Sequence, residues 1–141
     1  KKLDVVIMNR EEGASLTGLD YKREEKIFGA LDEYIPGAVI LTDGPKGVLV
    51  SDGKNIYRAG IFKNKNVADR TGAGDAFGSG FVAGLIKSNN VEEAIKLASA
   101  NATNVVEYIG AKAGILTKDQ FENDSRWENL YISAKRRFLA S

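Results

Sequence analysis

The chain has 141 residues, of which 43% are hydrophobic, and this length suits one domain with its own core. Its net charge of +1 excludes a strong overall field that would attract nucleic acid or an anionic membrane. The absence of cysteine and histidine excludes disulfides, thiolate nucleophiles, His-dependent triads and His metal ligands, so acid–base chemistry falls mainly to carboxylates.

The first part of the sequence predicts strands with an intervening helix. Apolar runs predict four strands, at residues 3–8, 38–42, 47–51 and 55–59. A helical spacing of apolar residues predicts a helix over residues 20–34, which Pro36-Gly37 ends. The sequence Asp52-Gly53 between two β-type runs is typical of a hairpin turn, so we expect an antiparallel edge to the sheet.

The remainder of the sequence predicts helices. Phe77, Phe81 and Leu85 recur every four residues, and Asn90 followed by Glu93 predicts the capped start of another helix. A capping box at residues 125–128 predicts a C-terminal helix. We expect its buried stripe to serve packing and no chemistry, and to consist of Trp127, Tyr131, Ala134 and Phe138.

The order of these elements predicts the fold class. A strand, a helix and further strands followed by several helices are typical of an α/β layer fold. We therefore expect a mostly parallel sheet with an antiparallel hairpin edge and flanking helices.

Residues 69–80 contain four glycines and lead from a loop into a helix. Close packing of that helix on the sheet explains Gly80 and Gly84, because small residues let backbones approach. Gly72 and Gly74 lie where the loop becomes helix, so bare N–H groups and the positive end of the helix dipole can face an anion. Taken alone, this pair of glycines indicates a tight turn more often than a phosphate site.

Asp75 directly follows these glycines and favours the phosphate site. An Asp at a helix start can simply complement the dipole. In a phosphate pocket, however, its carboxylate would lie where a donor phosphoryl group meets an acceptor hydroxyl, and could take the hydroxyl's proton. Competing motifs fail, because the chain has no Gly-x-x-x-x-Gly-Lys-Ser/Thr sequence and Phe77 stands where a dinucleotide fingerprint needs glycine.

Three motifs, in order, resemble those of one family, the ribokinase-like (pfkB-type) sugar and nucleoside kinases. Residues 69–77, Asp-Arg-Thr-Gly-Ala-Gly-Asp-Ala-Phe, closely resemble its second signature. Residues 9–12, Asn-Arg-Glu-Glu, resemble its Asn-x-x-Glu motif, and residues 42–47, Thr-Asp-Gly-Pro-Lys-Gly, resemble its Thr-x-Gly-x-x-Gly loop. The match is to the C-terminal portion of longer proteins. We therefore expect residues 1–141 to be a ribokinase-like three-layer fragment, the nucleotide-binding and catalytic portion, without the acceptor-binding and lid portion.

The resemblance implies a catalytic centre at the third motif. Asp75 would be the catalytic base, and an anion hole for the transferring phosphoryl group would consist of Gly72, Ala73 and Gly74. Because most phosphoryl transfers pass through a loose transition state, positioning would matter more here than strong basicity.

The resemblance also implies a nucleotide site. Thr42, Gly44 and Gly47 would hold the nucleotide phosphates. Asn9 and Glu12 would organise Mg²⁺ through its waters, which suits the reluctance of this ion to lose its hydration shell. Taken alone, Glu12 would be a surface acid.

Two further roles follow from the resemblance. Asp69 and Thr71 would bind an activating monovalent cation, K⁺, together with carbonyls near residues 110–114. Asn101 would lie beside the adenine. Without the family, Asp69 would be a turn residue and Asn101 a helix-surface amide.

These expectations combine into an ATP-dependent kinase that phosphorylates a hydroxyl of a small sugar. A nucleoside kinase of the same family is the nearest alternative, and a non-catalytic nucleotide-binding module is the alternative from another class. No apolar run approaches the roughly 20 residues of a membrane helix and no signal pattern opens the chain, so we expect a cytoplasmic protein with neither membrane nor nucleic-acid partners. An assembly, if one forms, would be a homodimer through the missing portion.

Overall fold

The computed structural model describes residues 4–62, 72–107 and 116–136. Contacts within the chain define two compact units. The sheet unit comprises residues 1–60 and 132–141, and the helical unit comprises residues 61–131. Among the described residues, no helix combines the length and the apolar character needed to cross a membrane.

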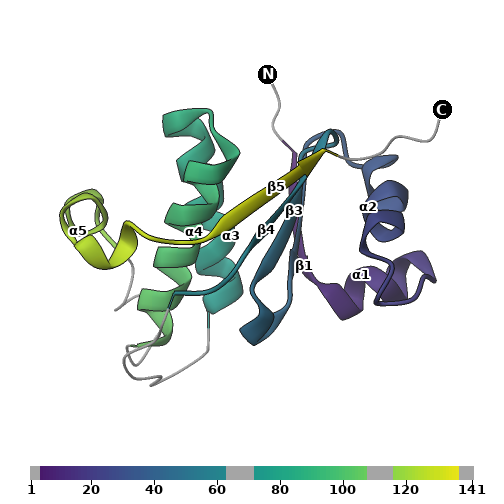
Figure 1. The fold of residues 1–141 in the computed structure, drawn as a ribbon, viewed down its shortest axis with the longest axis horizontal. Helices are drawn as coiled ribbons and strands as arrows, with labels where there is room; N and C mark the ends of the chain where they lie inside the picture. Colours follow the sequence, from purple (N-terminus) through teal and green to yellow (C-terminus); the bar gives the residue numbers. More distant parts are fainter. Residues whose placement is uncertain (1–3, 63–71, 108–115, 137–141) are drawn as a thin grey trace. The chain divides into compact units, whose positions relative to one another are not determined.

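The described residues of the sheet unit form five strands and two α-helices (Figure 1). In chain order its elements are β1 (Val5–Asn9), α1 (Arg10–Thr17), α2 (Glu24–Asp32), β2 (Ala38–Thr42), the short 3-10 helix η1 (Gly44–Lys46), β3 (Val48–Ser51), β4 (Asn55–Ala59) and β5 (Ile132–Arg136). The predicted strands at residues 38–42 and 55–59 agree with β2 and β4, and the predicted hairpin joins β3 to β4.

The strand order is β1-β2-β3-β4-β5, which confirms an α/β fold with an antiparallel edge. The expectation of a mostly parallel sheet is wrong for the described strands, because only β1 and β2 pair in parallel and the three other pairings are antiparallel. The reason lies in the connections. Helices α1 and α2 provide the crossover that a parallel pair requires, whereas short turns join β2 to β3 and β3 to β4.

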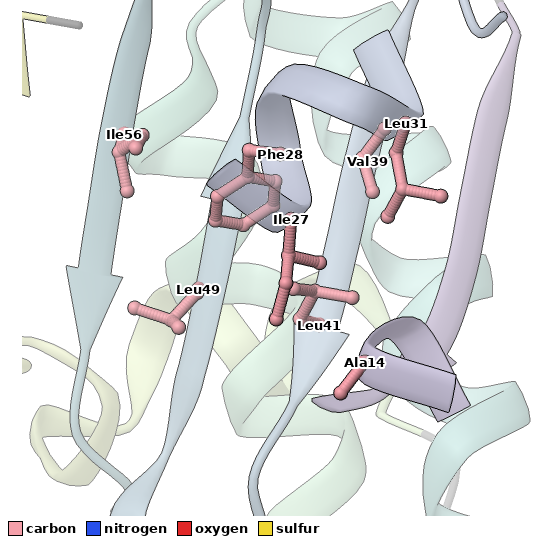
Figure 2. Packing of buried hydrophobic residues seen from close by; sticks show 8 residues of the cluster. All are labelled: Ala14, Ile27, Phe28, Leu31, Val39, Leu41, Leu49 and Ile56. Carbon is pink, nitrogen blue, oxygen red and sulfur yellow. The ribbon is translucent and has the colours of Figure 1, made fainter. Parts of the chain in front are cut away.

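The core of the sheet unit lies between α2 and one face of the sheet. Figure 2 shows Ile27, Phe28 and Leu31 of α2 packed over strand residues that include Val39 and Leu41. Val39 and Leu41 share a face because side chains alternate along a strand. Ile27, Phe28, Val39 and Leu41 are fully buried, so this apolar contact is the main stabilising feature of the unit.

Helix α1 was not predicted as a separate helix. The apolar spacing indicated one helix over residues 20–34, but the structure has α1 directly after β1 and a shorter α2. The signal for α1 was its cap, because Asn9 and Glu12 form a capping box at its start. Gly18, in the left-handed conformation, ends the helix after two turns.

The predicted C-terminal helix is wrong. Residues 125–127 form a single 3-10 turn, η2 (Ser125–Trp127), which Asp124 caps, and the chain then extends into β5 along β4. Pairing with β4 satisfies backbone groups that an open sheet edge would leave without partners, and this gain is invisible to helical spacing. Trp127 is buried as expected, Tyr131 is exposed, and Phe138 lies outside the described residues.

The helical unit is built on two long helices, α3 (Ala73–Ser88) and α4 (Val91–Val106), followed by the short α5 (Lys118–Asn123) and η2. Asn90 caps α4 as predicted, because its side chain accepts a hydrogen bond from the Glu93 N–H at 3.0 Å. Gly80 and Gly84 serve close packing, but of helix on helix rather than of helix on sheet. A Cβ on Gly84 would lie 2.7 Å from the Cα of Ala94, closer than carbon atoms can approach.

Replacing Gly84 by alanine is therefore expected to destabilise the fold by up to about 2 kcal/mol. The gain of about 1 kcal/mol in helix propensity is outweighed by overpacking against the α4 backbone, which typically costs 1–3 kcal/mol. Chemical denaturation of Gly84→Ala and of Ser79→Ala, an exposed position on the same helix, measures the difference. A stabilised Gly84→Ala protein would show that α3 and α4 are not in close contact.

Candidate nucleotide and phosphoryl-transfer site

The first two motifs meet at one edge of the sheet unit. Asn9 ends β1 and Thr42 ends β2, and the two are direct partners in the parallel register. Thr42 is also the register partner of Val48, which directly follows Gly47. The sheet therefore brings the Asn-x-x-Glu motif and the Thr-x-Gly-x-x-Gly loop side by side at the carboxyl ends of its parallel strands, which is the usual ligand edge of α/β folds.

Asn9 and Glu12 hold each other at the start of α1. The Asn9 side chain accepts a hydrogen bond from the Glu12 N–H at 2.7 Å, and the Glu12 carboxylate accepts one from the Asn9 N–H at 2.9 Å. This reciprocal arrangement explains the motif as a helix cap. Both residues are exposed, so their oxygens can also bind a hydrated cation.

Residues 42–47 fold into a tight turn, here called the phosphate loop after the role that the resemblance predicts for it. The Asp43 N–H donates to the Gly47 carbonyl at 2.9 Å, and the Lys46 N–H donates back to the Asp43 carbonyl at 3.1 Å. Gly44 and Gly47 have φ of 54° and 102°, a region that favours glycine. The backbone conformation of the loop therefore favours glycine at both positions.

Sequence reasoning missed a polar cluster that anchors this loop. The Tyr21 hydroxyl donates a hydrogen bond to the Asp43 carboxylate, and the Arg10 guanidinium contacts the same carboxylate at 3.4 Å. Arg10 also lies over the Tyr21 ring, 4.2 Å from its centre. Arg10 was visible inside the first motif, but nothing in the sequence connected it or Tyr21 with Asp43.

The environment of Tyr21 predicts an alkaline titration. The hydrogen bond to Asp43 raises the pKa of the hydroxyl above its ordinary value of 10.0. Burial and the negative charges of Asp43 and Glu11 raise this pKa further, whereas the positive charge of Arg10 lowers it. Because the folded pKa exceeds the unfolded one, the stabilisation is complete below pH 10.0 and is lost as pH rises through the raised pKa. Tyrosinate absorbance of the wild type minus that of Tyr21→Phe should show a midpoint above 10.0. A lower midpoint would contradict the contact.

Only part of the third motif, from Gly72 onward, belongs to the described residues. Asp69, Thr71 and residues 110–114, the expected cation site, lie outside them. Gly72 directly precedes α3, with φ of 83°, and has no side chain that could cap the helix. The N–H groups of Ala73, Gly74 and Asp75 form its first turn, where a helix offers no internal acceptor.

Asp75 is the third residue of α3 and is exposed. A Cβ on Gly74 would meet no atom within 4 Å, so the described residues leave space beside the helix tip. Two hollows of the helical unit, one along α4, α5 and η2 and one between α3, α4 and α5, have other linings and do not include Asp75.

Asn101 is a buried amide, unlike the helix-surface amide that its position would predict without the family resemblance. Its side-chain N–H group donates to the Ala76 carbonyl at 2.9 Å, and its oxygen accepts from the Leu116 N–H at 3.0 Å. Asn101 thus ties α4 to the first turn of α3, next to Asp75. The spacing of apolar residues along α4 does not distinguish this buried position from an exposed one.

Comparisons with known proteins agree with the three motifs. The family model described as pfkB family carbohydrate kinase matches residues 1–118. An ATP-dependent 6-phosphofructokinase of Thermoanaerobacterium thermosaccharolyticum is 34% identical over 111 residues, which cover 78% of this chain and 33% of that protein. A cytidine kinase of Thermococcus kodakarensis is 34% identical over 111 residues, covering 77% and 39%.

A solved structure shows the same fold. The Arabidopsis thaliana ribokinase complexed with ribose and ATP aligns with a TM-score of 0.74 at 26% identity, over 85% of this chain and 40% of that chain. The chain thus spans about a third to two fifths of the length of these three proteins. The family match over residues 1–118 confirms the resemblance seen in the motifs. The chain belongs to the pfkB family of carbohydrate kinases.

Proposed function

We propose that residues 1–141 form the nucleotide-binding and catalytic part of an ATP-dependent kinase that phosphorylates a hydroxyl of a small sugar. The observation that carries the proposal is the pairing of Asn9 with Thr42, which places two family motifs at one sheet edge, within a chain of the pfkB family. The composition is consistent with it, since phosphoryl transfer needs neither histidine nor cysteine.

The phosphoryl group would be held at the start of α3. The N–H groups that follow Gly72 lack internal acceptors, and the positive end of the helix dipole favours an anion there. Gly72, Ala73 and Gly74 would thus form the anion hole. Asp75, in the same turn, would accept the proton of the attacking hydroxyl, so that one helix tip supplies both functions.

The nucleotide phosphates would lie on the phosphate loop, against Thr42, Gly44 and Gly47. Asn9 and Glu12 offer amide and carboxylate oxygens, the ligand types that suit Mg²⁺. No group of three or more His, Cys, Asp or Glu residues gathers in the described parts of the chain, so contact through water fits better than a protein cage. When bound, Mg²⁺ would neutralise phosphate charge.

Two assignments remain part of the proposal. Asp69 and Thr71 would bind the monovalent cation. Asn101, whose amide is engaged by Ala76 and Leu116, would act near the adenine by holding the start of α3. The relative from Thermococcus kodakarensis is a cytidine kinase, so a nucleoside acceptor is the second candidate.

Calorimetric titration with Mg-ATP tests the nucleotide site directly, and we expect measurable binding. Thr42→Val should weaken it, because the hydroxyl beside the phosphates is lost. Thr17→Val is the matched control, since the Thr17 hydroxyl donates to the carbonyls of Gly13 and Ala14 within its own helix. Absence of heat at millimolar nucleotide would contradict a formed site.

The acceptor is tested separately in the full-length protein. A panel of sugars and nucleosides in the presence of Mg-ATP, read as ADP release, should show turnover with a sugar. Turnover with nucleosides alone would favour the second candidate, and nucleotide binding without turnover on any acceptor would favour a non-catalytic module.

A further inference from the structure

Three side chains to which the family motifs assign no role meet at the phosphate loop. Arg10 is the first residue of α1, Tyr21 lies between α1 and α2, and Asp43 is the second residue of the loop. They come from three separate segments of the sheet unit and meet at the sheet edge where Asn9 and Thr42 pair. We call these three residues the clamp.

Asp43 is the part of the clamp that belongs to the loop. Its carboxylate accepts hydrogen bonds from the Tyr21 hydroxyl and from Arg10, and its side chain is only 16% exposed. Its backbone N–H and carbonyl form the two hydrogen bonds that close the loop onto Gly47 and Lys46. Holding this carboxylate therefore restrains the residue whose backbone closes the loop on both sides.

Arg10 holds the tyrosine as well as the carboxylate. Its Nε donates to the Tyr21 carbonyl at 2.9 Å, its guanidinium stacks on the Tyr21 ring, and Glu24 lies 3.7 Å from its Nη1. The side chain is 10% exposed, so these contacts are well shielded from water. A lysine could not stack and donate in several directions at once, because it lacks the planar guanidinium.

Tyr21 contacts the loop at a second residue. The Lys46 ammonium lies 5.6 Å from the centre of the Tyr21 ring, within the range of a cation–π contact. Tyr21 thus has its hydroxyl on Asp43 and its ring near Lys46, at the two sides of η1. The tyrosine spans the turn that carries Gly44.

We propose that Arg10, Tyr21 and Asp43 are positioning residues that hold the phosphate loop in the conformation that binds nucleotide phosphates. The inference rests on the proposed function and adds a device to it. Because Arg10 directly follows Asn9, the clamp also fixes the distance between the first motif and the loop. Ordering the loop before binding removes an entropy cost that the nucleotide would otherwise meet, so the clamp should act on nucleotide affinity.

Tyr21→Phe tests the clamp with the smallest change, the loss of one hydroxyl. In the full-length protein we expect KM for Mg-ATP to rise by about tenfold, the usual worth of a hydrogen bond to a charged group, while kcat and the acceptor KM stay near wild type. Hydrogen exchange at the Lys46 and Gly47 amides should accelerate. Asp43→Asn, which keeps acceptor geometry but removes the charge, should show the same split, and provides the test if Tyr21→Phe does not fold.

The matched control is Tyr57→Phe. Tyr57 also directs its hydroxyl to a carboxylate, that of Asp52 at 3.5 Å, but at the hairpin turn on the other end of β3. Tyr57→Phe should leave unchanged both the KM for Mg-ATP and the hydrogen exchange of the Lys46 and Gly47 amides. A Tyr21→Phe protein that behaves like this control would overturn the clamp. So would one in which kcat falls and the acceptor KM rises as much as the KM for Mg-ATP. If wild-type protein binds no nucleotide, the proposed function fails, and the exchange rates alone still decide whether the clamp orders the loop.

Discussion

Replacing Asp75 by asparagine is expected to lower turnover of the full-length protein about 100-fold or more, the usual effect of removing a general base. Asparagine keeps the size of the side chain and its place in the first turn of α3, but it cannot accept the hydroxyl's proton. Mg-ATP affinity should stay within a few-fold, because the backbone N–H groups of the turn are unchanged. Steady-state kinetics with the best acceptor, together with calorimetry, measure both quantities.

Glu93→Gln provides the control for this experiment. Glu93 occupies in α4 the position that Asp75 occupies in α3, the third of the helix, and both acids face the positive end of a helix dipole. Both substitutions therefore remove a charge from an equivalent place. If turnover falls equally in the two variants, the loss reflects helix stability, and Asp75 is not the base. Near-wild-type turnover of Asp75→Asn would lead to the same conclusion.

Local features of the fold were predictable because their causes are local. The Asp52-Gly53 turn specified the β3–β4 hairpin, and the Asn90 side chain specified the start of α4. Gly80 and Gly84 of α3 were correctly assigned to close packing, although their partner is α4 rather than the sheet. Single residues with one dominant conformational requirement therefore carry the most information in this chain.

Features that depend on distant segments were not predictable. The strand β5 exists because β4 offers a free edge, and its residues alone have a helical spacing that predicted the opposite. Tyr21 and Asp43 are 22 residues apart and belong to no common repeat, so their contact follows only from the β1–β2 crossover. Likewise the side chain of Asn101 makes two hydrogen bonds to backbone groups, those of Ala76 and Leu116, that its position on α4 could not reveal.

Gly47→Ala is expected to be strongly destabilising, lowering the free energy of unfolding by more than about 4 kcal/mol. Two independent causes act there. With φ of 102° and ψ of −138°, Gly47 has a backbone conformation that L residues rarely adopt. In addition, a Cβ would lie 2.0 Å from the Ala59 carbonyl oxygen, so the loop could not keep its place beside β4.

Gly53→Ala separates these two causes. Gly53 also has a positive φ, 91°, but a Cβ there would meet nothing within 4 Å, so only backbone strain of about 1–2 kcal/mol should appear. Denaturant unfolding of both variants, with Mg-ATP titration of whichever remains folded, measures the excess due to the collision at Ala59. Equal losses in the two variants would mean that the phosphate loop can move away from β4. The collision requires Gly47→Ala to be the more destabilised variant. In that case the close approach of Gly47 to Ala59 holds together β3 and β4 and also the loop that is proposed to bind the nucleotide.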